Sequence, residues 1–462
     1  MLYVINALGL STAGGSRWGV WFLQYLSLAA ALWACYRNIL RWSHLHTAVL
    51  ITLSVTLTLP LVFENGNLPE SYALPFQFVG LLIGLYPSYA RRTAFWTGIC
   101  LGVSLGITFF LRQNLIGVWI TLMIVGGLEA AAQRTWQLYR IRLIGLILGF
   151  ALIAVPILLF LALHGVLAAF LDAAIYYNSL YTRDISVNSR IESVVEGIRD
   201  LAPSGLVFAA LAGWFLGWIR FVSAFRHSRS ISSIVLVVLI GLPVEMILSS
   251  LSVRSYPHYF MSWLPIIAVS AALLIERITR KRLVVVALLY AVFIQFAFVI
   301  TPIARKAVEA DTNKTDPVVD FITANTAPDD PVLMWGAETA YNFASGKRSP
   351  TRFVYQYPLY ASGYQRDALV TEFLNDLRMR CPALIIDTSA TNPIIPPLSA
   401  RLRETWVPAP GYELLPSMNA VFEHIDDHYV DAGMVGDWGW RAYERQNREC
   451  MGTATSQSVP RD

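Results

Sequence analysis

The sequence predicts a polytopic α-helical membrane protein with a small α/β domain after its last membrane span. Three observations support this prediction. About ten apolar stretches of roughly 17–22 residues lie between Trp18 and Ala304. Only 14% of the residues are charged, whereas an ordinary soluble domain has about 25%. After residue 304 the long apolar stretches stop, and short segments of mixed composition follow.

Each apolar stretch is long enough to cross a hydrocarbon core about 30 Å thick as a helix rising 1.5 Å per residue. The stretch near 74–90 is the shortest and contains Pro75 and Pro87. The expected spans are 18–36, 46–63, 74–90, 94–111, 115–132, 143–163, 204–223, 232–252, 259–275 and 283–303.

Positive charge alternates from one loop to the next. The five loops after the odd-numbered spans together hold 14 Arg and Lys residues. Because basic loops stay in the cytoplasm, the remaining loops and the N-terminus are expected outside. Residues 1–15 contain no Lys or Arg, so they lack the charged start of a secretory signal peptide. The net charge of +4 is explained by the basic loops that orient the protein in the membrane, so it indicates no nucleic-acid partner.

The segment 165–202 is the only long loop before the tail. Its start, 166–177, is an apolar helix with tyrosines at one end, which suits the membrane interface. Its second half, 190–200, has charged residues at helical spacing and predicts a solvated helix face.

Residues 305–462 predict an extracytoplasmic α/β domain, separate from the membrane domain at 1–304. Asp316-Pro317 is a typical helix start. We expect helices at 317–326 and 366–380, and strands at 331–335, 383–387 and 420–425. Cys381 and Cys450 would share an oxidising compartment, but their pairing cannot be established from the sequence.

Polar groups at membrane depth are costly and therefore candidates for function. The first group, residues 64–72, contains Glu64, Glu70 and three neighbours. The carboxylates could act as a general base or help to hold a divalent metal, and amides and phenols suit sugar hydroxyls. An ordinary turn explains the Asn-Gly and Leu-Pro dipeptides equally well. The three neighbours are Asn65, Asn67 and Tyr72.

The second group is Arg112-Gln113-Asn114, between two spans that have almost no loop between them. The Arg112 guanidinium can bind a phosphate in fork geometry. The alternative is that Arg112 reaches towards lipid phosphates. Asn114 is a further candidate for binding sugar or acceptor.

The third group runs from Arg254 through Tyr256 to His258 and Tyr259. Arg254 and His258 could bind a phosphate, and Tyr256 could contact the sugar or acceptor. A belt of aromatic residues at the membrane interface is the alternative. The sequence contains no Gly-rich phosphate loop, no Cys/His set at metal-ligand spacing and no nucleophile elbow. It therefore identifies no cofactor and no metal ligand. Because no ATP-binding motif is present, the sequence does not resemble an ATP-driven pump.

Residues 67–76, 111–114 and 256–260 resemble motifs of the GT-C integral-membrane glycosyltransferases. The likeness is to the bacterial branch related to protein O-mannosyltransferases and aminoarabinose transferases. Residues 334–336 and 349–355 look like the extracytoplasmic domain of that branch. The resemblance spans most of the chain, and each motif is moderately specific.

The resemblance implies a multi-pass protein of the inner membrane with an active site at the outer leaflet. It implies a polyprenyl-phosphate sugar donor, inversion at the anomeric carbon, and a lipid, glycan or protein acceptor. The donor phosphate would meet cations such as Arg112, Arg254 or His258.

The chain departs from the family pattern at its start. The family opens with a helix and an outer loop that bears an acidic residue, the presumed base, before a segment resembling residues 2–9 of this chain. We therefore expect that helix and loop to be missing, with Glu64 and Glu70 as weak substitutes for the base. A flippase for lipid-linked sugars and a non-catalytic truncated paralogue are the alternatives. Polar groups gathered at one face favour the enzyme, because transporters place them at the midplane.

Overall fold

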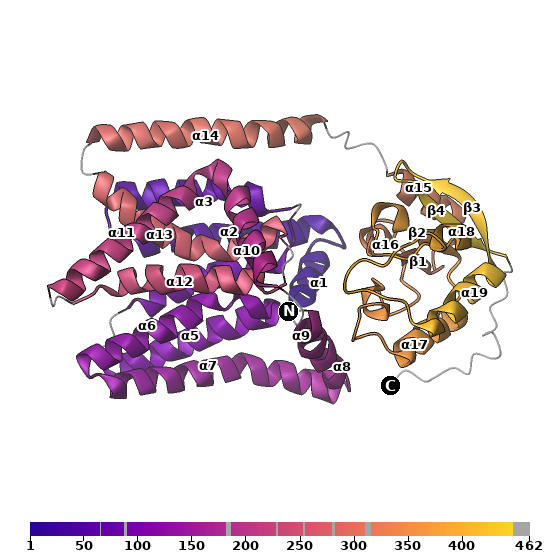
Figure 1. Cartoon of the computed structure of the whole chain (residues 1–462), viewed down its shortest axis with the longest axis horizontal. Coiled ribbons are helices and arrows are strands. Elements are labelled where there is room, and N and C mark those ends of the chain that lie inside the picture. Colours follow the sequence, from indigo (N-terminus) through magenta and orange to yellow (C-terminus); the bar gives the residue numbers. More distant parts are fainter. Residues whose placement is uncertain are drawn as a thin grey trace. The chain divides into compact units, whose positions relative to one another are not determined.

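The computed structural model describes residues 1–64, 66–86, 90–181, 186–227, 230–252, 255–279, 282–309 and 316–446. The chain forms two compact units, Met1–Ala307 and Val308–Asp462. The first is a helical bundle and the second contains a four-stranded sheet (Figure 1).

Nine helical segments in the described part of the first unit are long and apolar enough to cross a membrane. This confirms the predicted polytopic helical fold. The corresponding elements are α2 (Arg17–Leu40), α3 (Leu45–Val62), α5 (Arg91–Leu111), η1 (Gln113–Leu115) with α6 (Gly117–Gln133), α7 (Trp136–Leu163), α11 (Leu206–Arg226), α12 (Ser233–Ser249) with η4 (Ser250–Ser252), η5 (Pro257–Trp263) with α13 (Leu264–Ile278), and α14 (Arg282–Glu309).

The third expected span, 74–90, is the helix α4 (Pro69–Gly84), which starts earlier and has only 16 residues. At 1.5 Å per residue it extends about 24 Å, less than the thickness of a hydrocarbon core. Pro69 occupies the first helical turn, where its missing N–H costs nothing. α4 packs between α2 and α5.

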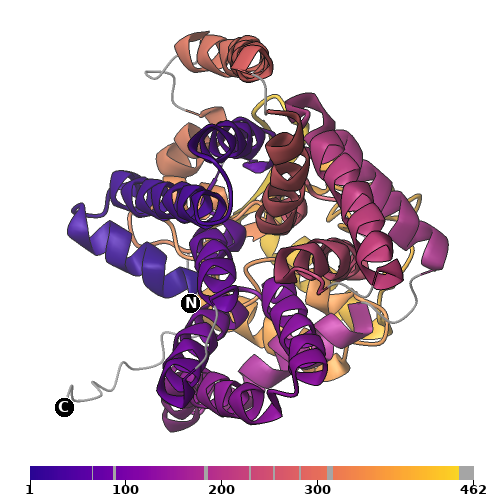
Figure 2. The ribbon, with the colours of Figure 1, turned by 90° about the vertical axis from the view of Figure 1, so that its left-hand side faces the viewer.

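The helices α5 and α7 form the most extensive helix–helix contact of the bundle. Glycines at spacing four face each other: a Cβ added at Gly102 would lie 2.0 Å from the Leu146 carbonyl oxygen, and one at Gly149 would lie 2.2 Å from that of Ile99. Small residues at this spacing let membrane helices approach backbone to backbone. α14, by contrast, runs along one side of the bundle (Figures 1 and 2), where Gln295 Nε2 donates to the Pro203 carbonyl oxygen at 2.8 Å.

Short helices complete the first unit. They are α1 (Leu2–Thr12), α8 (Leu167–Leu171), the π-helical η2 (Asp172–Tyr177), α9 (Asn178–Tyr181), α10 (Val187–Leu201) and η3 (Ala202–Ser204). The solvated face predicted over 190–200 is one side of α10, where Glu192 and Arg199 are exposed. The other side is buried at Ser193, Gly197 and Leu201.

The second unit has the strand order β1-β2-β4-β3. The strand β1 (Val332–Trp335) pairs in parallel with β2 (Leu384–Asp387), and β4 (Trp440–Arg445) pairs antiparallel with both β2 and β3 (Tyr429–Val435). Its helices are α15 (Pro317–Asn325), α16 (Ala340–Ala344), η6 (Tyr357–Leu359), α17 (Asp367–Arg380), η7 (Ser389–Thr391), α18 (Ala400–Arg403), η8 (Pro416–Met418) and α19 (Asn419–His428).

Two strands and two helices of this unit confirm their predictions, and the Asp316 carboxylate caps α15 by accepting from the Val318 N–H at 2.9 Å. The predicted strand at 420–425 is wrong, since this segment belongs to α19. Val421, Phe422 and Ile425 are buried, and this spacing marks one face of a helix. Cys450 lies outside the described residues, so its pairing with Cys381 stays untested.

Candidate functional site

The turn between α3 and α4 holds Glu64 in an unusual backbone conformation. The φ angles of Glu64, Gly66 and Asn67 are 35°, 83° and 53°. Positive φ is uncommon for residues other than glycine, and such strain is concentrated at functional sites. At Gly66 an added Cβ would lie 2.8 Å from the Phe63 ring. The turn therefore presents the Glu64 side chain in a fixed direction.

Glu70 and Arg112 form an ion pair between two separate polar groups of the sequence. Glu70 lies in the first turn of α4, where the helix dipole favours a carboxylate. Its side chain is 1% exposed, whereas that of Arg112 is 25% exposed. The Arg112 backbone is extended between α5 and η1, so its side chain can turn away from both helices.

The Arg112 guanidinium also lies over the ring of Tyr259, with Cζ 3.9 Å from the ring centroid. Tyr259 belongs to η5, which follows Pro257. A cation over an aromatic face is attracted by the ring quadrupole. Glu70 and Tyr259 thus hold the guanidinium in one plane. A guanidinium has five N–H donors, more than these two neighbours can use, so it can still bind an anion.

His258 joins the α3–α4 turn to η5. Its Nδ1 pairs with a carboxylate oxygen of Glu64. The His258 ring stacks on Tyr256 with centroids 5.6 Å apart, and it meets the Tyr259 ring edge-on at 4.6 Å. The position of His258 is therefore determined by aromatic packing on two sides and by a carboxylate.

Asp200 approaches Glu64 from α10. A Cβ added at Gly197 would lie 2.5 Å from the Phe260 ring, so α10 packs closely on η5. Burial, followed by the charges of Glu196 and Glu64, raises the pKa of the Asp200 carboxyl. A raised pKa suits a general base, which works best near the pH of its surroundings.

We call Glu64, Glu70, Arg112, Asp200, His258 and Tyr259 the polar cluster. Its members come from the α3–α4 turn, α4, the α5–α6 connection, α10 and η5. It joins residues of all three polar groups that the sequence singles out. It places one guanidinium and several carboxylates beside an imidazole.

The other predicted site residues lie outside this cluster or on its edge. The Tyr72 hydroxyl is within 3.3 Å of the Asn67 amide oxygen and 3.4 Å of the Val20 carbonyl oxygen, and Tyr72 is buried. These contacts hold the turn together. Asn114 lies in η1 beside Arg112, and Tyr256 contacts the cluster through His258. Asn65 and Arg254 lie outside the described residues.

Three polar residues that the structure places in or beneath the site were not among the predicted site residues. Asp200 was assigned to a solvated face, and Tyr259 was given no role. Glu245, in the middle of α12, is fully buried, and a Cβ at Gly117 would lie 2.4 Å from its Oε1. An ionisable residue inside an apolar span was a feature that could have identified Glu245.

The sequence left open whether the carboxylates help to hold a divalent metal. Within the described ranges, no group of three or more His, Cys, Asp or Glu side chains is arranged to hold a metal ion.

Solved structures of ArnT share the fold. No family model matches the chain, and no curated protein sequence matches it. ArnT from Cupriavidus metallidurans in the apo state is 13% identical with a TM-score of 0.59, over 96% of this chain and 86% of ArnT. ArnT from the same organism bound to undecaprenyl phosphate is 14% identical with a TM-score of 0.59, over 96% and 87%. The chain therefore has the ArnT fold, which confirms the predicted membrane helices with a small C-terminal α/β domain.

Proposed function

We propose that this protein is a membrane glycosyltransferase that moves a hexose or pentose from a polyprenyl-phosphate donor to an acceptor outside the cytoplasm. The acceptor would be a lipid, a glycan or a protein. One observation carries the proposal: Arg112 is partly exposed and is held in place by Glu70 and Tyr259. The likeness to a solved ArnT bound to undecaprenyl phosphate supports the choice of donor.

In the proposed reaction, the acceptor hydroxyl oxygen attacks the anomeric carbon and the bond from that carbon to the phosphate oxygen breaks. The polyprenyl phosphate leaves, and its charge is stabilised by Arg112. A carboxylate takes the hydroxyl proton. Glu70 is a poor candidate for this base, because it is buried and bound to Arg112. Glu64 and Asp200 are the better candidates, with His258 holding Glu64.

By the positive-inside rule, the end of the bundle that carries the polar cluster faces outwards in the inner membrane, together with the C-terminal unit. This orientation can be checked by labelling single cysteines from the outside. Labelling of a cysteine at Trp438, which is exposed, should be as strong in intact cells as in lysed cells.

The decisive experiment measures donor binding and sugar transfer by purified protein in nanodiscs. Replacing Arg112 by Ala or Lys should weaken binding of a polyprenyl-phosphate sugar about tenfold or more, since a hydrogen bond to a charged group contributes roughly 1.5–3 kcal/mol. Lys keeps the charge but lacks the fork and the flat face. Arg140→Ala, at an exposed position of α7, is the control. Unchanged affinity in both Arg112 variants would reject the role.

An assay in sealed vesicles, instead of nanodiscs, distinguishes a glycosyltransferase from a flippase. A donor that crosses the bilayer with its sugar still attached, and without any transfer product, would support the transporter instead.

A further inference from the structure

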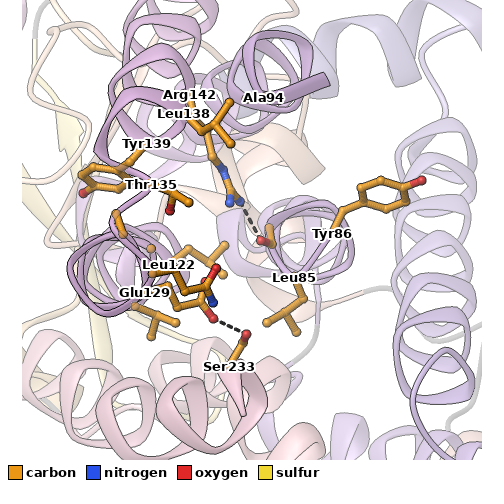
Figure 3. A pocket seen from close by; sticks show the side chains of 15 residues that line it. Leu85, Tyr86, Ala94, Leu122, Glu129, Thr135, Leu138, Tyr139, Arg142 and Ser233 are labelled. Atoms are coloured by element: carbon orange, nitrogen blue, oxygen red, sulfur yellow. Dashed lines mark hydrogen bonds between the residues drawn. The ribbon is translucent and has the colours of Figure 1, made fainter. Parts of the chain in front are cut away.

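A second polar site lies at the opposite end of the bundle, where the arginine-rich loops gather. It is a cavity of about 270 Å³ between α4, α5, α6, α7 and α12. Figure 3 shows its side chains, with Arg142 on one side and Glu129 with Ser233 on the other. Neither Arg142 nor Glu129 belongs to the polar cluster, and the proposed transfer does not use them.

Arg142 and Glu129 are both held by uncharged partners. The Arg142 Nη2 donates to the Gly84 carbonyl oxygen at 2.6 Å, at the C-terminal end of α4. The Ser233 hydroxyl donates to the Glu129 carboxylate. Both charges line the cavity, yet no salt bridge between them is found among the described residues. The cavity therefore presents a cation and an anion that face a common space.

Uncharged polar groups complete the lining. Gln133, Thr135 and Tyr139 also line the cavity. Tyr139 is held by donating to the Met123 carbonyl oxygen at 2.9 Å. Leu122, Leu138 and Val125 supply the apolar part of the wall. Such a lining suits a small polar ligand attached to an apolar chain.

The location identifies the class of ligand. The cavity is formed at the ends of α4 and α6 and the starts of α5, α7 and α12, which is the level of lipid head groups. Basic pockets between membrane helices on the cytoplasmic side bind phospholipid head groups. A single anionic head group would satisfy Arg142 but would be repelled by Glu129. A head group with both charges satisfies both residues.

We propose that this cavity binds the phosphoethanolamine head group of an inner-leaflet phospholipid. The phosphate accepts from Arg142, and the primary ammonium donates to Glu129. A choline head group has no N–H to donate, and a glycerol head group has no cation. The site should therefore prefer phosphatidylethanolamine to phosphatidylcholine and phosphatidylglycerol.

Native mass spectrometry of the purified full chain, with equal amounts of the three lipids, tests this. Wild-type protein should retain phosphatidylethanolamine, and Glu129→Gln should weaken its binding about tenfold by loss of a charge-assisted hydrogen bond. This variant keeps an oxygen for Ser233, so it should fold normally. Arg142→Gln should have a similar effect, and Arg140→Ala, on the same helix, should have none.

Three results would overturn the proposal: equal retention of all three lipids, preference for phosphatidylglycerol, or binding that neither variant alters. Soluble phosphoethanolamine distinguishes a lipid ligand from a free one. If it fails to displace the lipid, the acyl chains contribute to binding and the proposed lipid is supported. If it binds alone with equal affinity, the ligand is a free phosphate ester and the lipid assignment is wrong.

Discussion

The two ends of the membrane unit handle buried charge in opposite ways. In the polar cluster, cations meet carboxylates directly: Arg112 pairs with Glu70 and His258 pairs with Glu64. At the other end, Arg142 and Glu129 are each held by an uncharged group. Paired charges fix the positions of side chains without a ligand, whereas charges held only by uncharged groups can still bind a charged ligand. The first arrangement suits catalysis and the second suits binding.

The largest expected effect is on the rate of sugar transfer, and it involves Asp200 in the polar cluster. If Asp200 is the general base, Asp200→Asn should lower the rate of sugar transfer about 10²–10⁴-fold. Glu192→Gln, at an exposed position of the same helix, should leave the rate unchanged. The rate is measured as polyprenyl phosphate released in nanodiscs. Normal transfer by Asp200→Asn would leave Glu64 as the candidate base.

The pH dependence of transfer follows from the raised pKa of Asp200. The base must be ionised, so activity should fall as the pH drops through this raised pKa, at a higher pH than for an ordinary aspartate. Ionising a carboxyl whose folded pKa is raised costs stability above the unfolded pKa. Asp200→Asn should therefore be at least as stable as wild type at neutral pH, and a clear loss of stability would contradict this assignment.

The next effect tests the ion pair itself. Arg112→Ala leaves the Glu70 carboxylate buried without its partner, which should cost about 3–5 kcal/mol of unfolding free energy. Replacing both residues by Leu should restore much of this loss, because a buried pair is often no more stabilising than apolar side chains. Unfolding in detergent, followed by tryptophan fluorescence, measures both. A double variant as unstable as Arg112→Ala would show that the pair is not the cause.

A smaller effect is expected at Tyr259. Tyr259→Leu removes the ring beneath Arg112, and this cation–π contact is worth about 0.5–2 kcal/mol. Donor affinity should fall several-fold, as measured by the binding assay with the labelled donor. Tyr259→Phe keeps the ring and should keep most of the affinity. If the Phe variant is as weak as the Leu variant, the hydroxyl rather than the ring face is what matters.

Much of the membrane fold could be predicted because apolar length and loop charge are local properties of the sequence. The site was predictable only in part. Glu70 and Arg112 could each be identified as candidates because burying a charge in a membrane is costly. Their pairing could not be predicted, because it joins positions 42 apart, and the pairing of His258 with Glu64 joins positions 194 apart. Such contacts depend on how the helices pack. Asp200 was not predicted as a site residue because its proximity to Glu64 depends on how α10 packs on the bundle.

The short apolar segments show the same limit on a smaller scale. Residues 420–425 were predicted to form a strand because their apolar composition was noted without its helical spacing. A run this short does not distinguish a buried strand from a buried helix. The strands β3 and β4 were missed. β3 lacks the alternation of buried and exposed residues that marks a strand, because its five inner residues are all exposed or half-buried.

The smallest predicted effect is at the other end of the bundle, and it tests the comparison most directly. Glu129→Gln removes a charge but keeps an oxygen that can accept from Ser233. Because no salt bridge to this carboxylate is found among the described residues, the unfolding free energy in detergent should change by only about 1 kcal/mol or less. The same substitution at Glu70 should cost more, since it breaks the ion pair with Arg112. An equal decrease of the unfolding free energy in the two variants would mean that both carboxylates have the same structural role. The charge on Glu129 would then stabilise the fold and not bind a ligand.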